Sequence, residues 1–324
     1  MARLPASGVL PAIALAAGLV FPLVANNYWL HVANYSLIYL LPALGLNLIF
    51  GYVGLLSLAQ GAFFGLGAYS CALMSLHFGW PFPATIAFAA AFCAGIALLL
   101  AGPSLRLRAY SFVMATLGFV FVAEAVAKNW IALTRGDMAL TGIPRPSLAF
   151  LGIDLTLQAL WHYYVLLLAL AVAGSAFFLW LVRSPAGRLL VAIRDEEMLA
   201  RSYGIRVDFH KAIAFAISAA FAGAGGAAYA MYETVVSPQI FQLYFTLLFL
   251  VIVFAGGAGT FSGVVIGTGL FVSIPEALRI APDLRMLLYG IVFLVFVFWL
   301  PRGIGPAVRR LHLARIAAGR EADR

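Results

Sequence analysis

The chain has 324 residues, of which 64% are hydrophobic and only 10% are charged, and its mean hydropathy is +1.03. These values exclude a soluble globular protein, because a soluble chain of this length needs a charged exterior over its buried core. The net charge of +8 comes from 20 Lys and Arg against 12 Asp and Glu. Most of the basic residues directly follow long apolar runs, which indicates membrane topology and argues against nucleic-acid binding.

Ten apolar segments approach or reach the roughly 20 residues that a membrane-spanning helix needs. The predicted fold is an all-α, polytopic transmembrane bundle that forms a single domain over residues 1–324. The helices are expected at 8–25, 34–50, 61–77, 83–104, 110–128, 162–182, 212–232, 244–256, 261–275 and 285–300. The first resembles a signal peptide, but the many spans after it favour an uncleaved helix. The eighth and ninth are short, which predicts tilted, broken or re-entrant segments.

The basic residues also orient the bundle. With the amino terminus in the cytoplasm, the predicted inside segments carry fifteen Lys and Arg and the outside segments five. This bias agrees with an even number of spans and with both termini in the cytoplasm, where 302–324 forms a basic tail. The outside loop between residues 130 and 161 could contact an external partner or could simply cover helix ends.

A glycine pattern, GxxxxxxGxxxGxG, occurs twice at an offset of 202 residues and predicts an internal repeat. GxxxG steps remove side chains from one helix face, so that a neighbouring backbone can approach closely. Both copies enter a helix from the same predicted side, which favours a parallel duplication. Helix packing is therefore predicted for Gly54, Gly61, Gly65 and Gly67 and for their counterparts Gly256, Gly263, Gly267 and Gly269.

Several polar side chains lie in otherwise apolar spans, where they are costly unless paired. Asn47, Ser57 and Gln60 either hydrogen-bond one helix to another or line a solute path, and packing is favoured for each alone. Glu124 is a carboxylate well inside a span, and Lys128 one turn later is expected to pair with it. The candidates for a translocation path are Asn47, Ser57, Gln60, Tyr69 and Glu124.

The hydrophilic loop 183–211 is predicted to form two short helices. Ser184 can cap the first, with Pro185 at its first position, and Asp195 can cap the second. Gly204 can end the second in a left-handed conformation. Apolar side chains interspersed with six cations and four acids suit docking to another protein better than resting on anionic lipid.

Enzyme signatures are missing from the sequence. It contains no phosphate-binding GxxxxGK followed by Ser or Thr, no HExxH and no GxSxG, so the chain is not expected to hydrolyse ATP itself. Cys71 and Cys93 lie in apolar helices without a CxxC, and the five His share no ligand spacing. We therefore predict no metal site, no disulfide and no cofactor in this chain.

Several motifs, taken together, resemble one family. GLNLIFGYVGLLSLAQGAFFGLGAY (45–69) resembles the opening signature of the branched-chain amino acid ABC transporter permeases of the LivM type. TLGFVFVAEAV and TGIPRP resemble the middle of that family, GRLLVAIRDEEMLARSYGI (187–205) resembles its cytoplasmic coupling segment, and AFAGAGGAAYA and VFAGGAGTFSG resemble its later helices. LPRGIGP (300–306) resembles its ending, so the resemblance covers about 35–306.

The resemblance implies half of a bacterial inner-membrane importer for branched-chain or related amino acids. It implies a homologous LivH-like permease, two ATPase subunits that hold ATP and Mg²⁺, and an external solute-binding protein as partners. It also implies an ATPase-coupling role for Ile193, Arg194, Asp195, Glu196, Glu197, Ala200 and Gly204. Met198 stands where the general coupling signature has Glu, so the acid that contacts the ATPase stays open between neighbouring residues.

Two alternatives to amino-acid import remain at the level of the sequence. The same machinery could import urea or an aromatic solute. A stand-alone secondary transporter would instead need an ion site, for which Glu124 is the candidate, and no ATPase partner.

Overall fold

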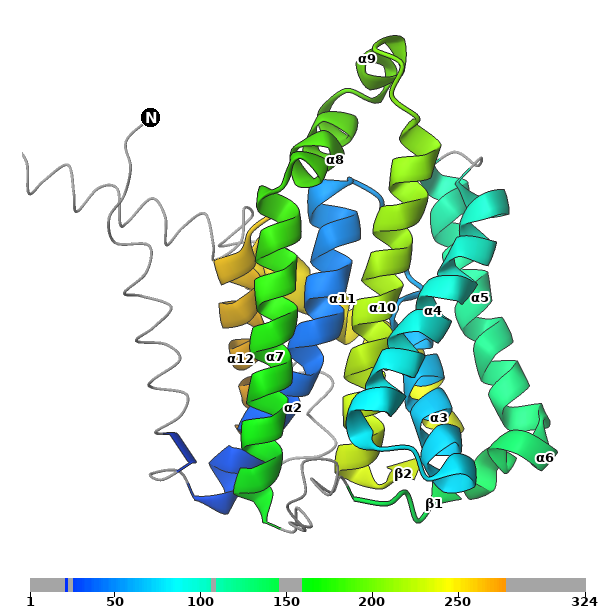
Figure 1. Ribbon diagram of the computed structural model, residues 1–324, viewed down its shortest axis with the longest axis vertical. Coiled ribbons are helices and arrows are strands. Elements are labelled where there is room, and N and C mark those ends of the chain that lie inside the picture. Colours follow the sequence, from blue (N-terminus) through cyan, green and yellow to red (C-terminus); the bar gives the residue numbers. More distant parts are fainter. Residues whose placement is uncertain (1–20, 23–25, 106–108, 146–158, 278–324) are drawn as a thin grey trace, which may run out of the picture.

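The computed structural model describes residues 21–22, 26–105, 109–145 and 159–277 (Figure 1). Within them, six helices are long and apolar enough to cross a membrane, and two shorter apolar helices accompany them. The six are α2 (Asn27–Leu46) with the π-helix η2 (Asn47–Tyr52), α3 (Gln60–Phe78), α4 (Phe82–Ser104), α5 (Ala109–Asn129), α7 (Leu160–Arg183) and α10 (Val207–Glu233). The shorter two are α11 (Leu243–Gly256) and α12 (Phe261–Ala277).

The all-α bundle predicted from the sequence is confirmed. Eight of the ten expected helices are found at or near their predicted positions. The expected helix at 285–300 lies outside the described residues, as does almost all of the one at 8–25.

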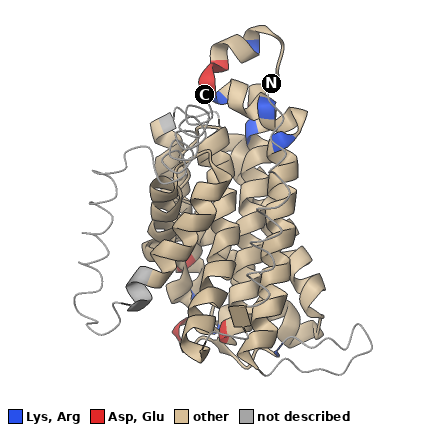
Figure 2. Cartoon of the chain, turned by 90° about the vertical axis from the view of Figure 1, so that its left-hand side faces the viewer, with Lys and Arg blue, Asp and Glu red and all other residues tan. Residues whose placement is uncertain are grey.

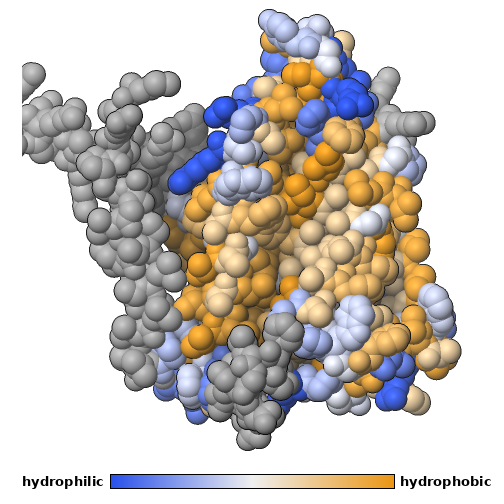
Figure 3. Space-filling view, in the orientation of Figure 1, coloured by the Kyte–Doolittle hydropathy of each residue, from blue (hydrophilic) through white to orange (hydrophobic). Residues whose placement is uncertain are grey.

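Three helices form the centre of the bundle. In an apolar stretch of 18 residues from each helix, 72%, 67% and 67% of the residues are buried in α2, α3 and α10. The corresponding values for α4, α5 and α7 are 28%, 28% and 22%. The second group therefore presents its apolar side chains outward, and Figure 3 shows an apolar flank between two more hydrophilic ends. An apolar exterior of this kind is suited to lipid or to another membrane subunit and not to water.

Short elements close the end of the bundle opposite α8 and α9. They are α6 (Ile131–Thr134), η3 (Gly136–Met138), β1 (Leu140–Thr141), β2 (Val235–Val236) and η5 (Pro238–Phe241). β1 and β2 pair antiparallel, with Leu140 opposite Val236. In Figure 1 this pair lies at the bottom, below α3 and α10. The loop after α5 is thereby joined to the segment that leads into α11.

Two segments of the bundle core are not α-helical. Pro42 lies inside α2, and the chain changes to the π-helix η2 before it leaves helical structure, in agreement with the predicted interruption near Gly51 and Gly54. After β2, the 3₁₀ turn η5 buries Pro238, Ile240 and Phe241. Irregular backbone at membrane depth is tolerated where protein surrounds it, and most residues of both segments are buried.

Most of the glycines of the repeat lie at close helix contacts. A Cβ on Gly67 would overlap the backbone of Gly223 in α10, and one on Gly61 would overlap Thr246 in α11. Gly65 lies against the ring of Phe241, and Gly256, Gly263 and Gly267 lie where α11 and α12 meet. Two positions differ from the prediction. Gly54 lies in the loop after η2 with φ +80°, and Gly269 has open space beside it among the described residues.

Candidate coupling site and helix junction

Two short helices project from one end of the bundle. They are α8 (Pro185–Asp195) and α9 (Glu197–Ser202), here called the α8–α9 unit, and they stand at the top of Figure 1. The predicted start of α8 is confirmed, because the Ser184 hydroxyl accepts a hydrogen bond from the Gly187 amide at 3.3 Å and Pro185 is the first helical residue. Pro suits this position because its missing N–H would have no partner there.

The prediction that Asp195 caps α9 is wrong. Asp195 is the last residue of α8, and its carboxylate binds the Arg194 guanidinium at 2.9 and 3.0 Å instead of an amide of the next helix. Glu196 precedes α9 and makes no side-chain cap. Gly204 has φ +78°, as predicted, and the following Ile205 amide donates to the Ala200 carbonyl at 3.2 Å.

A small apolar core supports the unit. Ile193 of α8 and Ala200 of α9 are buried with Val207, the first residue of α10. By contrast, Met198 and Tyr203 are each 78% exposed, and Leu199 is 55% exposed. The tip of the unit therefore presents apolar side chains to the exterior, although the hydrophilic surroundings in Figure 3 place it outside the apolar flank. Such a surface is typical of a protein-docking site.

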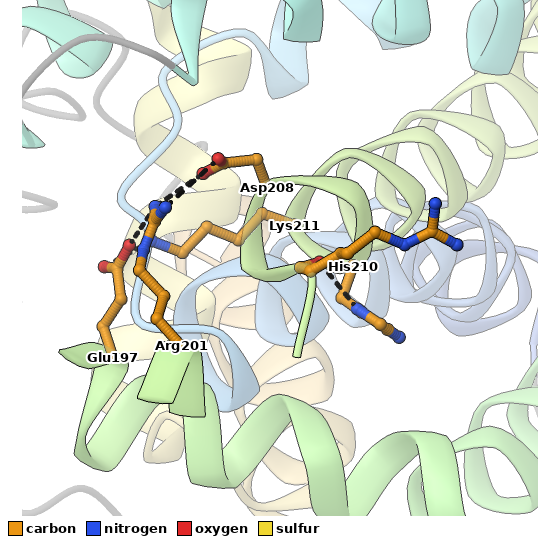
Figure 4. A network of polar contacts seen from close by, with 6 residues as sticks. Glu197, Arg201, Asp208, His210 and Lys211 are labelled. Carbon is orange, nitrogen blue, oxygen red and sulfur yellow. Dashed lines mark hydrogen bonds and ion pairs between the residues drawn. The ribbon is translucent and has the colours of Figure 1, made fainter. Parts of the chain in front are cut away.

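An ion-pair network fastens α9 to α10 (Figure 4). Glu197 binds Lys211 at 2.6 Å and Arg201 at 3.0 Å, and Arg201 also binds Asp208 at 2.8 Å. Burial raises the pKa of Glu197, but the hydrogen bonds from Lys211 and Arg201 lower it more, so that the net pKa lies below the ordinary value. Glu197 is therefore engaged within the chain, whereas the Glu196 side chain is exposed and makes no hydrogen bond or ion pair among the described residues.

Arg194 points back toward the bundle. Its Nη1 donates to the Gly51 carbonyl of η2 at 2.6 Å, across 143 residues of sequence. The aliphatic stem lies against Gly54, where a Cβ would stand 2.7 Å from Arg194 Cγ. The side chain is 37% exposed, so it is only partly accessible to a partner.

The carbonyl that Arg194 binds lies where two breaks in the helices meet. These are residues 51–54 at the end of η2 and residues 257–260 between α11 and α12, together called the junction here. The Asn47 amide bridges them, because its Oδ1 accepts from the Gly259 N–H at 2.8 Å and its Nδ2 donates to the Thr260 carbonyl at 3.5 Å. A Cβ on Gly51 would overlap Gly259. Gly51 and Gly259 each lie three residues from the first glycine of one copy of the repeat, so the starts of the two copies lie close together here.

Gln60 hydrogen-bonds one helix to another. Its Nε2 donates to the carbonyl of Pro42 at 2.8 Å and to that of Ser218 at 3.3 Å, while its Oε1 accepts from the Ser218 hydroxyl at 3.2 Å. It is 1% exposed. This side chain joins α2, α3 and α10 at the centre of the bundle, which is one of the two roles left open from the sequence.

The other candidates for the translocation path are dispersed. The buried Ser57 hydroxyl accepts from the Ala59 amide at 3.3 Å. Tyr69 stacks on Phe241, and its buried hydroxyl has no hydrogen-bond partner among the described residues. Glu124 pairs with Lys128 at 2.7 Å near the end of α5, as expected. Among the described residues, no hydrogen bond or ion pair joins one of the five candidates to another.

Aromatic and titratable side chains from α2 and α10 form a cluster that was not predicted from the sequence. Tyr35 donates to the Glu233 carboxylate, and His31 bonds the Tyr232 hydroxyl. The rings of Tyr35, Tyr39, Tyr229 and Tyr232 pack together within 6.4 Å, with Phe64, Phe245 and Phe249 beside them. The spacing of His31, Tyr35 and Tyr39 at every fourth residue places them on one face of α2 and was the available signal.

A family model for the permease component of branched-chain amino acid transport systems matches residues 28–297. This range contains the spans of the described residues, except the first residue of α2, together with the α8–α9 unit and both sides of the junction. The chain belongs to this permease family. The family resemblance drawn from the sequence motifs is thereby confirmed.

Individual relatives agree with the family. The permease is 31% identical to the high-affinity branched-chain amino acid transport system permease protein LivM of Escherichia coli K12, over 91% of this chain and 74% of that protein. It is 27% identical to LivH of the same organism, over 75% of this chain and 82% of LivH. A probable LivM of Methanocaldococcus jannaschii is 26% identical over 45% of this chain and 47% of that protein. No solved structure matches the permease.

Proposed function

We propose that this chain is one permease subunit of an ATP-driven importer for branched-chain or related amino acids. Membership of the permease family over residues 28–297 is the observation that carries the proposal. Its relatives LivM and LivH are named as permease proteins of one high-affinity transport system, which supports pairing of this chain with a homologous, LivH-like subunit. The remaining partners would be two ATPase subunits with ATP and Mg²⁺ and an external solute-binding protein.

The α8–α9 unit is the proposed docking site for an ATPase subunit. It projects beyond the bundle and exposes Met198, Leu199 and Tyr203, and it also exposes Glu196, whose side chain has no ion-pair partner in the described part of the chain. Apolar side chains within a charged rim are typical of a protein interface. Because Glu197 is held by Lys211 and Arg201, Glu196 is the acid better placed to meet a partner.

The charge distribution supports a cytoplasmic location for this end. Six basic residues occur between Arg183 and Lys211, whereas the described part of the opposite end carries Lys128, Arg135 and Arg145. Figure 2 shows Lys and Arg residues, in blue, gathered at the end from which the α8–α9 unit projects. Lys and Arg are enriched on the cytoplasmic side of membrane proteins, so the proposed setting is the inner membrane of a bacterium with this end inward.

Alternating access is the mechanism that suits this arrangement. Closure of the ATPase dimer on ATP would displace the two docking units, and the bundle would change from inward-open to outward-open. The breaks after η2 and between α11 and α12 are places where helix segments can change their relative angle, because they carry glycines with positive φ at Gly54, Gly257 and Gly259.

Uptake of labelled solutes by proteoliposomes tests the proposal. The chain is reconstituted with its co-purified partners and binding protein, with or without ATP, and labelled leucine, phenylalanine and urea are compared. We expect ATP-dependent leucine uptake that unlabelled isoleucine and valine inhibit. Uptake of urea or of phenylalanine without uptake of leucine would assign a different solute to the same kind of importer. Uptake driven by an ion gradient without an ATPase would overturn the proposal.

A further inference from the structure

We propose that Arg194 is a positioning residue that fastens the α8–α9 unit to the junction, so that displacement of the unit moves both broken helices together. The inference rests on the proposed function, since it assigns the route by which an ATPase would act on the permease. It gives Arg194 a partner inside this chain and not in the ATPase.

The guanidinium is held in a fixed orientation by two partners. Asp195 accepts from Nε and Nη2 at 3.0 and 2.9 Å, and Nη1 donates to the Gly51 carbonyl at 2.6 Å. A planar fork can satisfy a carboxylate with one edge and a carbonyl with the remaining donor, which a lysine ammonium cannot do in the same geometry. The hydrogen bond to Gly51 is short, as expected for a charged donor.

The stem of Arg194 adds a steric contact to this hydrogen bond. Gly54 has φ +80° and no side chain, and Arg194 Cγ occupies the space that a Cβ would need. The glycine therefore permits both the turn and the close approach of the arginine. A push on α8 toward the bundle would meet the backbone of the junction directly.

The junction transmits this contact to a second pair of helices. Gly51 and Gly259 are in backbone contact, and Nη1 of Arg194 lies 3.6 Å from the Cβ position of Gly259. Asn47 bonds both Gly259 and Thr260 across the same contact. A displacement of Gly51 would therefore carry with it the turn that links α11 to α12.

The covalent link and the ion pairs of the unit lead to α7 and α10. α8 follows directly from α7 through Ser184, and α9 is tied to α10 by the ion pairs of Glu197 and Arg201 with Lys211 and Asp208. Among the hydrogen bonds of the described residues, the bond from Arg194 to Gly51 is the one that connects a side chain of the unit to the junction. Its removal should leave the unit folded while freeing the junction.

The test measures transport and ATP hydrolysis together in the complete complex. Arg194→Ala and Arg194→Lys are compared with Arg188→Ala, which removes the same charge from the exposed face of the same helix. Solute imported per ATP hydrolysed is the readout, because loss of coupling lowers it while a general loss of protein lowers both rates alike. We expect roughly a tenfold loss for Arg194→Ala, partial rescue by lysine and no change for Arg188→Ala.

A second readout keeps the inference separate from the proposed function. Hydrogen–deuterium exchange of residues 257–260 in the detergent-solubilised permease should speed up in Arg194→Ala and not in Arg188→Ala. If the wild type imports solute and Arg194→Ala keeps the normal ratio, the inference is overturned. If the wild type shows no ATP-dependent import, the proposed function fails. In that case, hydrogen–deuterium exchange of residues 257–260 that Arg194→Ala leaves unchanged would also overturn the proposed link between Arg194 and the junction.

Discussion

The contact of α3 with α10 and the junction are both built around glycines, but in opposite ways. Along α3 and α10, Gly67 meets Gly223 and Gly226 meets the Phe64 carbonyl, with backbone against backbone and no side chain between them. At the junction, a few directional bonds from Asn47 and Arg194 hold breaks in the helices. Close-packed backbones resist deformation, whereas a few hydrogen bonds can move as a unit. We therefore interpret the contact of α3 with α10 as the rigid part of the bundle, here called the frame, and the junction as the part that moves.

The largest effect is expected from Gly226→Ala in the frame. A Cβ there would overlap the Phe64 carbonyl oxygen, and two helix backbones cannot separate without opening the centre of the bundle. We expect a loss of about 1–3 kcal/mol or failure to fold. The control is Gly95→Ala in α4, where nothing lies within 4 Å of the new methyl group. The measurements are the thermal unfolding midpoint in detergent and the yield of monodisperse protein. Equal midpoints and yields for the two variants would contradict the interpretation of the α3–α10 contact as the frame.

Asn47→Leu should have the next largest effect because it removes the bridge across the junction. The Gly259 N–H would lose its acceptor in a partly buried position, at a cost of about 1–2 kcal/mol. Thr268→Val is the matched control, since among the described residues its buried hydroxyl bonds only to Val264 of its own helix. We expect a lower unfolding midpoint for Asn47→Leu than for the control. A midpoint equal to that of Thr268→Val would show that the bridge contributes little.

Gly54→Ala separates backbone strain from the Arg194 contact. Gly54 and Gly142 have φ +80° and +78°, so alanine at either position should cost about 1 kcal/mol. Only the methyl group at Gly54 meets another side chain, because Gly142 has open space around it. Both variants should therefore lose similar stability, but only Gly54→Ala should lower the solute imported per ATP. If both variants import the same amount of solute per ATP, the result would contradict transmission from the α8–α9 unit to the junction through Arg194.

The smallest effect concerns the pH dependence of the α9–α10 network. The pKa of Glu197 is lowered in the folded protein, so its ion pairs contribute stability above the ordinary value of 4.5 and lose it as the pH falls through the folded pKa. The unfolding midpoint should drop more between about pH 5 and about pH 3 in the wild type than in Glu197→Gln. The carboxylate is 41% exposed, which limits the difference. Identical pH profiles would contradict the assignment.

The sequence predicted the helices because their apolar runs are long, and it predicted the start of α8 because a Ser-Pro cap is a local signal. α2 begins at Asn27 and not near 34, because Asn26 caps it by accepting from the Trp29 amide at 3.1 Å. Polar residues between 26 and 34 lower the hydropathy of this part of α2, so the apolar pattern did not predict it as helix.

The candidate site was less predictable. Asp195 has the residue type of a helix cap, but the adjacent Arg194 binds its carboxylate. The contact of Arg194 with Gly51 joins residues 143 positions apart, so no local pattern encodes it. The polar residues left open between packing and transport, Asn47 and Gln60, both make bonds between helices. Their partners are backbone groups, which the sequence does not specify.

Distances between spin labels test the division into frame and moving part most directly. One pair joins Ala186 on α8 to Ala258 in the turn after α11, and the other joins Ala258 to Leu99 on α4, all three at exposed positions. The pairs are measured in the complete complex with and without ATP. We predict that ATP leaves the first distance unchanged and shifts the second, because α8 and the turn move together against the frame, on which α4 packs at Gly223. A shift in the first distance with a constant second distance would contradict this account.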